Sequence, residues 1–161
     1  MQKLLLVLFL LFNQICFSQS VQNKDQEKIT KVVRDFLACL ETQDTALYKS
    51  LLFENAQIWV VRKRRDSLRT FVRTFKEDYL NFDPKQIVHE VPLHIDLKVH
   101  NDIAIAWVPY ELKVNGNFSH CGVDTFTLLN TPGGWKIVSL VYSVEPDGCA
   151  DIKNRYAGQK P

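Results

Sequence analysis

The sequence has 161 residues, of which 46% are hydrophobic and 24% are charged, and its formal net charge is +2 at pH 7. This length favours a single domain. Because the charges nearly balance and no basic stripe is interleaved with aromatic residues, nucleic acid is not expected as a partner.

The N-terminus predicts a secretory signal peptide over residues 1–18. Lys3 supplies the positive charge, an apolar run follows over Leu4 to Phe12, and Ser18 offers a small residue for cleavage. The apolar run is shorter than the about 20 residues that a spanning helix needs. We therefore expect a secreted or periplasmic protein, with no transmembrane segment in the mature chain.

Helices are expected in the first half of the chain. Apolar residues at steps of three and four predict a helix from about Asp25 to Glu41. Asp44 can cap a second helix over 45–53. A strand is expected over 56–61, after which Asp66 can cap a third helix. The apolar face of this third helix would comprise Leu68, Phe71, Val72, Phe75 and Tyr79.

From residue 87 onward, β-forming residues alternate with turn signals such as Asn115-Gly116-Asn117. Four antiparallel strands are expected, over 87–99, 103–114, 118–129 and 135–144. Strands of this length curl strongly. The order predicts an α+β fold with three N-terminal helices packed on a strongly curved, mostly antiparallel sheet. The domain would cover residues 19–148, and the polar tail over 149–161 would be loose.

Three cysteines follow the predicted signal segment: Cys39, Cys121 and Cys149. In an oxidising compartment they permit at most one bridge. Cys39 falls on the first predicted helix, where we expect it to be packed. A bridge from Cys121 to Cys149 would tie the tail to a strand, and two free buried thiols are the alternative.

Several segments, in this order, resemble the nuclear transport factor two-like superfamily of ketosteroid isomerase-like and SnoaL-like cone-shaped α+β barrels. They are Val32-Val33-Arg34-Asp35-Phe36-Leu37, the second helix begun by Asp44, Cys121-Gly122-Val123-Asp124-Thr125-Phe126, and Gly134-Trp135-Lys136-Ile137. The resemblance covers about residues 25–146. It implies a cystatin-like cone that encloses a pocket between the helices and the sheet.

The ketosteroid isomerase-like branch uses an aspartate base together with a tyrosine and a protonated aspartic acid. The resemblance places Asp124 at the position of the protonated acid. Phe36 stands at the position of the tyrosine and Val60 at about the position of the base, and neither side chain can do that work. Steroid isomerase chemistry is therefore not expected.

The candidate catalytic residues are Asp124, His120 and Tyr142. Strand alternation places His120 and Asp124 on the same wall. Since residues four apart on a strand are about 13 Å apart, the two would need water or substrate between them. The Tyr142 hydroxyl could donate to a ligand oxygen, and ordinary core packing is the equal alternative.

Three functions remain open. The leading one is an exported protein that binds a small apolar or amphipathic molecule without a cofactor. The first alternative is an isomerase, dehydratase or hydrolase that uses Asp124 with His120 or Tyr142. The second is a dimeric interaction module with Trp135 and Ile137 on its outer sheet face. The expected pocket is lined by Phe36, Val60, Trp107, Asp124, Leu140 and Tyr142.

Cations gather near the predicted third helix. The run from Arg62 to Arg65, with Arg69 and Arg73, could bind an anion, and a solvated surface is the simpler interpretation. The four histidines do not show metal-ligand spacing, so no metal is expected. No nucleotide-binding motif is present, which leaves no cofactor implied.

Overall fold

The computed structural model describes residues 24–64, 67–147 and 149–159. The predicted signal segment and Asp66 lie outside these residues. The elements in chain order are a first helix over 24–42, α2 (Thr45–Ser50), β1 (Leu52–Arg64), β2 (Ser67–Thr74), α3 (Phe75–Leu80), β3 (Val88–Pro92), β4 (Asp96–His100), β5 (Ile103–Val114), β6 (Asn117–Thr131), β7 (Gly134–Val144) and α4 (Cys149–Tyr156).

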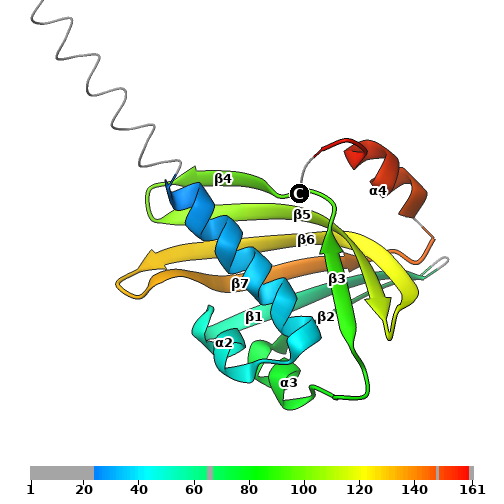
Figure 1. Cartoon of the computed structure of the whole chain (residues 1–161), viewed down its shortest axis with the longest axis horizontal. Helices are drawn as coiled ribbons and strands as arrows, with labels where there is room; N and C mark the ends of the chain where they lie inside the picture. The colour runs from blue at the N-terminus through cyan, green and yellow to red at the C-terminus, as the bar shows by residue number, and fades with distance from the viewer. Residues whose placement is uncertain (1–23, 65–66, 148, 160–161) are drawn as a thin grey trace, which may run out of the picture.

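One curved sheet carries the fold, in the strand order β2-β1-β7-β6-β5-β3, and β4 also pairs with β5. All pairs are antiparallel except β1 with β7, which run parallel. Figure 1 shows the first helix lying across one face of the sheet, with α2 and α3 beside its C-terminal end, while α4 lies apart from these three helices. The predicted α+β architecture is confirmed.

The first helix follows its apolar periodicity. Ile29, Val33, Phe36 and Leu37 are each 4% exposed or less and belong to the main core cluster. The Phe36 ring contacts the rings of Tyr48, Phe75 and Phe126. Cys39 is a free, buried thiol on this helix, as expected, and burial raises its pKa to about 11. At the next turn the Asp44 side chain accepts from the backbone amides of residues 46 and 47, which confirms the predicted N-cap of α2.

The expected third helix is wrong over most of its length. Residues 67–74 form β2, which pairs antiparallel with β1, and only residues 75–80 are helical. Phe71 and Val72 fit the apolar spacing of a helix as well as that of a strand. Pairing of residues 67–74 with β1 satisfies the backbone hydrogen-bonding groups along the edge of β1, which a helix at this place would leave unpaired. The helix begins instead at Thr74, whose capping box with Glu77 satisfies the first turn.

The single strand expected over 87–99 is two strands. β3 pairs with residues 110–114 of β5 and β4 with residues 103–107, so both lie along the same edge of β5. The break follows Pro92, which has no amide hydrogen to continue the ladder. Leu93 rejoins by donating its amide to the Pro109 carbonyl at 2.7 Å.

The C-terminal tail is ordered, contrary to expectation. A disulfide joins Cys121 of β6 to Cys149, the first residue of α4. α4 then lies over the outer face of the sheet, where Tyr156 accepts a hydrogen bond from the Trp107 indole at 3.1 Å. Lys153 pairs with Glu111 of β5. These links supply the packing that the polar sequence of the tail lacks by itself.

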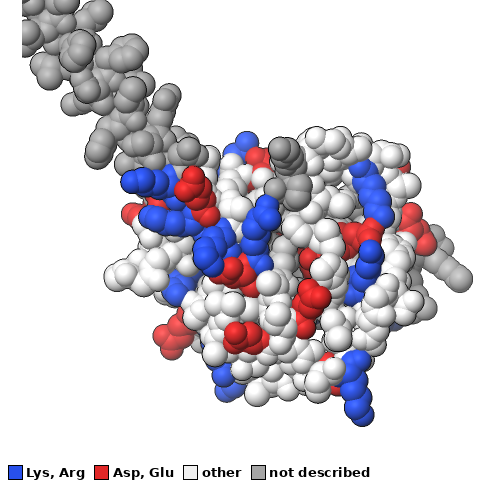
Figure 2. All heavy atoms as spheres, viewed as in Figure 1, with Lys and Arg blue, Asp and Glu red and all other residues white. Residues whose placement is uncertain are grey.

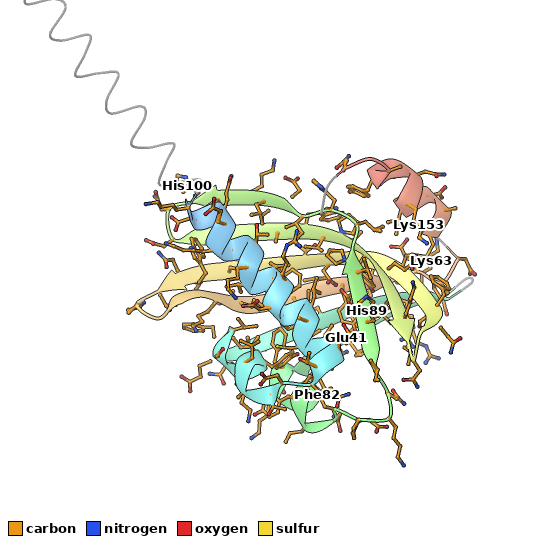
Figure 3. The ribbon with its side chains drawn as sticks, viewed as in Figure 1. Glu41, Lys63, Phe82, His89, His100 and Lys153 are labelled. Carbon is orange, nitrogen blue, oxygen red and sulfur yellow. A yellow bond between two sulfur atoms is a disulfide. The ribbon has the colours of Figure 1, made fainter. Side chains whose placement is uncertain are left out.

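Charges on the surface are mixed. Figure 2 shows acidic and basic side chains interspersed on the face that carries the first helix. Glu41 at the end of this helix accepts from His89 of β3 at 2.8 Å, and both are labelled in Figure 3. Among the described residues, the helices are too short or too polar for any of them to cross a bilayer.

Gly122 marks the closest approach in the sheet, and its replacement by Ala is predicted to be destabilising. A Cβ on residue 122 would lie 2.1 Å from the Ser143 carbonyl oxygen and 2.7 Å from the Tyr110 hydroxyl. Because backbone must move to relieve this overlap, we expect the free energy of unfolding to fall by about 2 to 3 kcal/mol. Urea denaturation checks this, with Gly133→Ala as the control, since a Cβ there meets nothing closer than 3.7 Å. An unchanged midpoint for Gly122→Ala would contradict the packing described.

Candidate functional site

A cavity of about 310 Å³ lies between the first helix, α3 and the inner face of the sheet. Apolar side chains from the helix and from β7 form much of its wall, including Phe36, Leu40 and Leu140. The polar groups that enter it include Arg73 of β2, Glu90 of β3, Asp124 of β6 and Tyr142 of β7.

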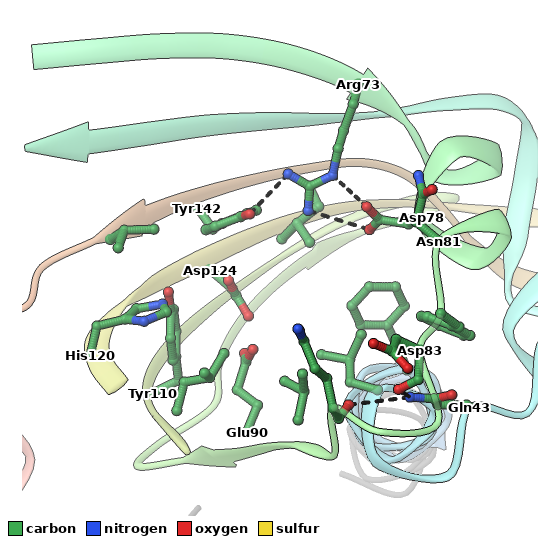
Figure 4. Close-up of a pocket in the computed structure, with 18 of the residues that line it drawn as sticks. Gln43, Arg73, Asp78, Asn81, Asp83, Glu90, Tyr110, His120, Asp124 and Tyr142 are labelled. Carbon is green, nitrogen blue, oxygen red and sulfur yellow. Dashed lines mark hydrogen bonds and ion pairs between the residues drawn. The ribbon is translucent and has the colours of Figure 1, made fainter. Parts of the chain in front are cut away.

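Two carboxyl groups meet inside this cavity. Asp124 of β6 is 3% exposed, and Figure 4 shows its carboxyl facing that of Glu90 on β3. The Oε1 atom of Glu90 is sealed from solvent and has no hydrogen-bond partner, although other parts of this residue are partly exposed. A buried acceptor without a partner is costly, so this oxygen is a point where a ligand can be recognised.

The pair cannot hold two negative charges. Burial, and then the charge of Glu90 and hydrogen bonding with it, raise the pKa of Asp124 well above its usual value. Burial also raises the pKa of Glu90, while hydrogen bonding to Asp124 opposes that rise. Two like charges in contact in a poorly solvated site favour a state with one shared proton. The pair therefore holds this proton between its two carboxyl groups, and its remaining oxygens can accept hydrogen bonds from a ligand.

A second polar group crosses the cavity from β2 to β7. The Arg73 guanidinium donates to the Asp78 carboxylate of α3 and, at 3.0 Å, to the Tyr142 hydroxyl oxygen (Figure 4). Tyr48 donates to the same carboxylate at 3.2 Å. Since Arg73 can only donate, it occupies one lone pair of the Tyr142 oxygen and leaves the hydroxyl hydrogen free to point into the cavity. Burial raises the pKa of Tyr142, which keeps this donor protonated.

His120 lies at the other end of the cavity, near the start of β6. Its ring packs edge-on against Tyr110, and the Ser119 hydroxyl lies 2.9 Å from its Nδ1 atom. Burial and the neighbouring charge of Arg62 lower the pKa of His120, so the imidazole is neutral at neutral pH. A neutral imidazole can accept or donate one hydrogen bond, and it adds no charge to the site.

A family model described as "Putative lumazine-binding" matches residues 24–143, which contain all of the polar residues described above. The chain belongs to this family. The family's description indicates a small-molecule ligand. No functionally curated protein matches the sequence.

Solved structures of nuclear transport factor two-like proteins share the fold of this lumazine-binding family member. One from Streptomyces avermitilis, described as a "putative dehydratase from the NTF2-like family", has a TM-score of 0.63 at 16% identity and covers 76% of this chain and 97% of its own. A superfamily protein from Salmonella enterica has a TM-score of 0.60 at 18% identity, covering 77% and 93%. An NTF2-like protein from Cytophaga hutchinsonii has a TM-score of 0.60 at 16% identity, covering 74% and 97%. At these identities the likeness shows the cystatin-like fold.

In this family member the cavity brings together most of the residues singled out from the sequence. They are Phe36, His120, Asp124, Leu140 and Tyr142. His120 and Asp124 share the inner face of β6, as strand alternation predicts. The structure does not bring these two into direct contact, and the partner of Asp124 is Glu90.

Four placements differ from expectation. Val60 is 1% exposed and belongs to the core, away from the cavity. Trp107 is 44% exposed on the outer face, because the inner face of β5 carries the small residues Ala104 and Ala106 in the core cluster. Trp135 and Ile137 point inward and are buried, so they cannot form an outer interface. Both residues lie at the start of β7, at alternating positions that face the core.

Sequence reasoning missed Glu90 and the role of Arg73. Glu90 pairs with Leu112, which lines the same cavity, so alternation along residues 88–92 would have placed it inside. Arg73 was assigned to a surface helix. On a strand it alternates with Val72 and faces inward opposite the buried Ile58.

The histidines of this family member are dispersed over the fold. His89 pairs with Glu41, His94 stacks on Tyr156, His100 lies next to Asn101, and His120 lines the cavity. Over the described ranges, no three His, Cys, Asp or Glu side chains gather in a way that could hold a metal ion.

Proposed function

We propose that this chain is an exported binding protein for one small, flat, amphipathic molecule of the lumazine type, held in the cavity without a cofactor. The observation that carries the proposal is the buried Glu90 and Asp124 pair, with an unpartnered carboxylate oxygen, in a largely apolar cavity. Such a pair is costly to fold and gains its partners when a ligand binds.

The chemistry of a lumazine ring suits these walls. Its edge carries N–H donors next to carbonyl acceptors, and its faces are apolar. The carboxyl oxygens left over by the shared proton can accept from the ring N–H groups, and the free Tyr142 hydrogen can reach a carbonyl oxygen. The cavity of about 310 Å³ is at the small end of ligand pockets, which favours a ligand of one or two rings.

Isothermal titration calorimetry of the purified protein with lumazine tests this proposal. We expect one saturable site per chain and a higher melting temperature with excess lumazine, because a ligand that binds only the folded state stabilises it. No heat of binding and no thermal shift at any soluble lumazine concentration would sink the lumazine assignment.

Tyr142→Phe is predicted to weaken lumazine binding by about fivefold to tenfold, since it removes one neutral hydrogen-bond donor. Calorimetry measures the loss. Tyr156→Phe is the matched control, because that hydroxyl lies on α4 at the outer face and should leave the affinity unchanged. If Tyr142→Phe binds lumazine as the wild type does, the hydroxyl makes no contact with the ligand.

An acid–base enzyme is the second candidate, favoured by the pair that shares one proton. Asp124 could give a proton to a bound molecule while Glu90 or His120 accepts another, as in a dehydration or an isomerisation. The similar structure from Streptomyces avermitilis is described as a putative dehydratase. Turnover of a ligand that co-purifies from the host, followed by mass spectrometry and lost in Asp124→Asn, would favour the enzyme over the binding protein.

Export is supported by the disulfide between Cys121 and Cys149, because such bonds persist in oxidising compartments. Residues 1–18 would serve as the signal peptide. The N-terminal sequence of the protein recovered from its own host, together with the compartment it is recovered from, tests this part. An uncleaved chain in the cytoplasm would refute it.

Self-association is a further part of the proposal. Trp59, Val141 and Trp107 lie in one row across the outer face of the sheet, and each is at least 40% exposed. An apolar row of this kind is typical of an interaction surface. Light scattering would show a dimer, and a monomer at every concentration would exclude one.

A further inference from the structure

A second hollow adjoins the cavity at its His120 end. It has a volume of about 410 Å³ and lies between the β1–β2 hairpin and the start of β6. Its lining includes Arg62, Lys63, Arg69, Phe71, Ser119 and His120. Arg62 and His120 line the cavity as well, so the two spaces meet at these side chains. We call this second hollow the basic groove.

Two arginines stand directly opposite each other in the basic groove. Arg62 of β1 and Arg69 of β2 are register partners, and both are exposed. Like charges placed opposite each other on neighbouring strands destabilise a sheet. Among the described residues, neither arginine forms an ion pair with a carboxylate.

Arg73 lies on the same strand as Arg69 but has fixed partners within the protein. Alternation along β2 puts Arg69, Phe71 and Arg73 on one face, the face that looks toward the cavity. Arg73 is held by Asp78 and Tyr142. Among the residues that the structure describes, no carboxylate holds Arg69 in this way, so its charge is available to a ligand.

We propose that the basic groove binds a phosphate-type oxyanion at the end of a tail on the same molecule whose ring fills the cavity. This assignment rests on the proposed function and adds the ligand class, a flat heterocycle with an anionic tail. Two guanidinium groups can each present a fork of donors to a phosphate, which is the geometry that binds oxyanions most strongly. Phe71 offers an apolar wall along the tail, and His120 lies where ring and tail would join.

The position of the basic groove allows one molecule to place its ring in the cavity and its tail in the groove. Figure 3 shows Lys63 at the hairpin end of the sheet, far from Phe82, which lies by α3 at the other end of the cavity. A ligand would thus place its ring against Glu90 and Asp124 and extend past His120 toward Arg62 and Arg69. Binding of an anionic tail would thus explain why the sequence gathers cations around Arg62 and Arg69.

The test compares 8-ribityllumazine with the same compound carrying a 5′-phosphate, by calorimetry at low salt. We expect the phosphorylated compound to bind wild-type protein at least about tenfold more tightly, because hydrogen bonds between guanidinium and phosphate are charge-assisted and strong. Arg69→Gln should remove most of this preference and leave the affinity for unsubstituted lumazine, which has no tail to reach the groove, unchanged. Lys98→Gln is the control, because this exposed lysine lies on the outer side of β4 and the preference should remain. Higher salt should shrink the preference.

Each outcome separates the groove from the cavity. If both compounds bind wild-type protein equally, the groove assignment is overturned and the proposed function stands. If neither compound binds, the ring assignment fails, and inorganic phosphate then serves as the probe. Phosphate binding that Arg69→Gln abolishes would show a site for free phosphate and would overturn the assignment to a tail.

Discussion

Asp124→Asn is expected to make the protein more stable at neutral pH and to weaken lumazine binding by about tenfold. The wild-type fold must hold a proton on a carboxyl that is ionised in the unfolded chain, because burial and Glu90 raise the pKa of Asp124. An amide of the same shape needs no proton and can still donate to Glu90. Asp124→Asn therefore removes the free-energy cost that the displaced pKa imposes on the wild-type fold at neutral pH.

The sign of the pH dependence follows from linkage. When the pKa of an acid is higher in the folded state than in the unfolded state, the folded protein binds more protons between the two values. The stability of the wild type should therefore fall as the pH rises from about 4 toward neutrality. Asp124→Asn should show a flatter curve and should approach the wild type at the acidic end.

Urea denaturation between about pH 4 and pH 8 measures both curves, a range chosen to start at the usual pKa of a carboxyl. Asp96→Asn is the matched control, since this exposed carboxyl lies on the outer side of β4. A constant difference in stability between the wild type and Asp124→Asn across this range would show that Asp124 holds no displaced proton. Glu90→Gln should flatten the curve in the same direction, because burial raises the pKa of Glu90 as well.

Cys149→Ser is expected to lower the free energy of unfolding by about 3 to 4 kcal/mol, the amount predicted for a bridge that closes a loop of this length. Cys121 and Cys149 are separated by 28 residues. Freed from the bridge, α4 would still be held by contacts that include those with His94, Trp107 and Glu111. We therefore expect the melting temperature to fall by about 10 °C.

The affinity for lumazine should remain unchanged in Cys149→Ser, because α4 lies on the face opposite the cavity. A reducing agent should destabilise the wild type by a similar amount and leave Cys149→Ser unaffected. Ala150→Ser, one residue along the same helix, is the control for a new hydroxyl. Equal stability of wild type and Cys149→Ser would mean that the bridge does not constrain the unfolded chain.

Much of the fold can be predicted from local signals. The first helix and β5, β6 and β7 follow from apolar periodicity and from turns at residues 101–102, 115–116 and 132–133. The face of β6 that carries His120 and Asp124 follows from alternation alone. These segments are long and regular, so local preference and tertiary packing agree.

The remainder depends on long-range contacts. Residues 67–74 fit a helical period as well as a strand, and only the free edge of β1 decides between them. Trp107 is apolar enough for a core, yet the core at that point takes Ala104 and Ala106 instead. Glu90 meets Asp124 across strands that are far apart in the sequence, so no spacing along the chain reveals their pairing.

A two-dimensional proton–nitrogen NMR titration of the labelled protein with lumazine tests the central proposal most directly. We predict saturable shifts that centre on Glu90, Asp124 and Tyr142, while the indole signal of Trp107 on the outer face stays in place. No saturable shifts, or shifts confined to the outer face around Trp107, would contradict the assignment of the cavity as the ligand site.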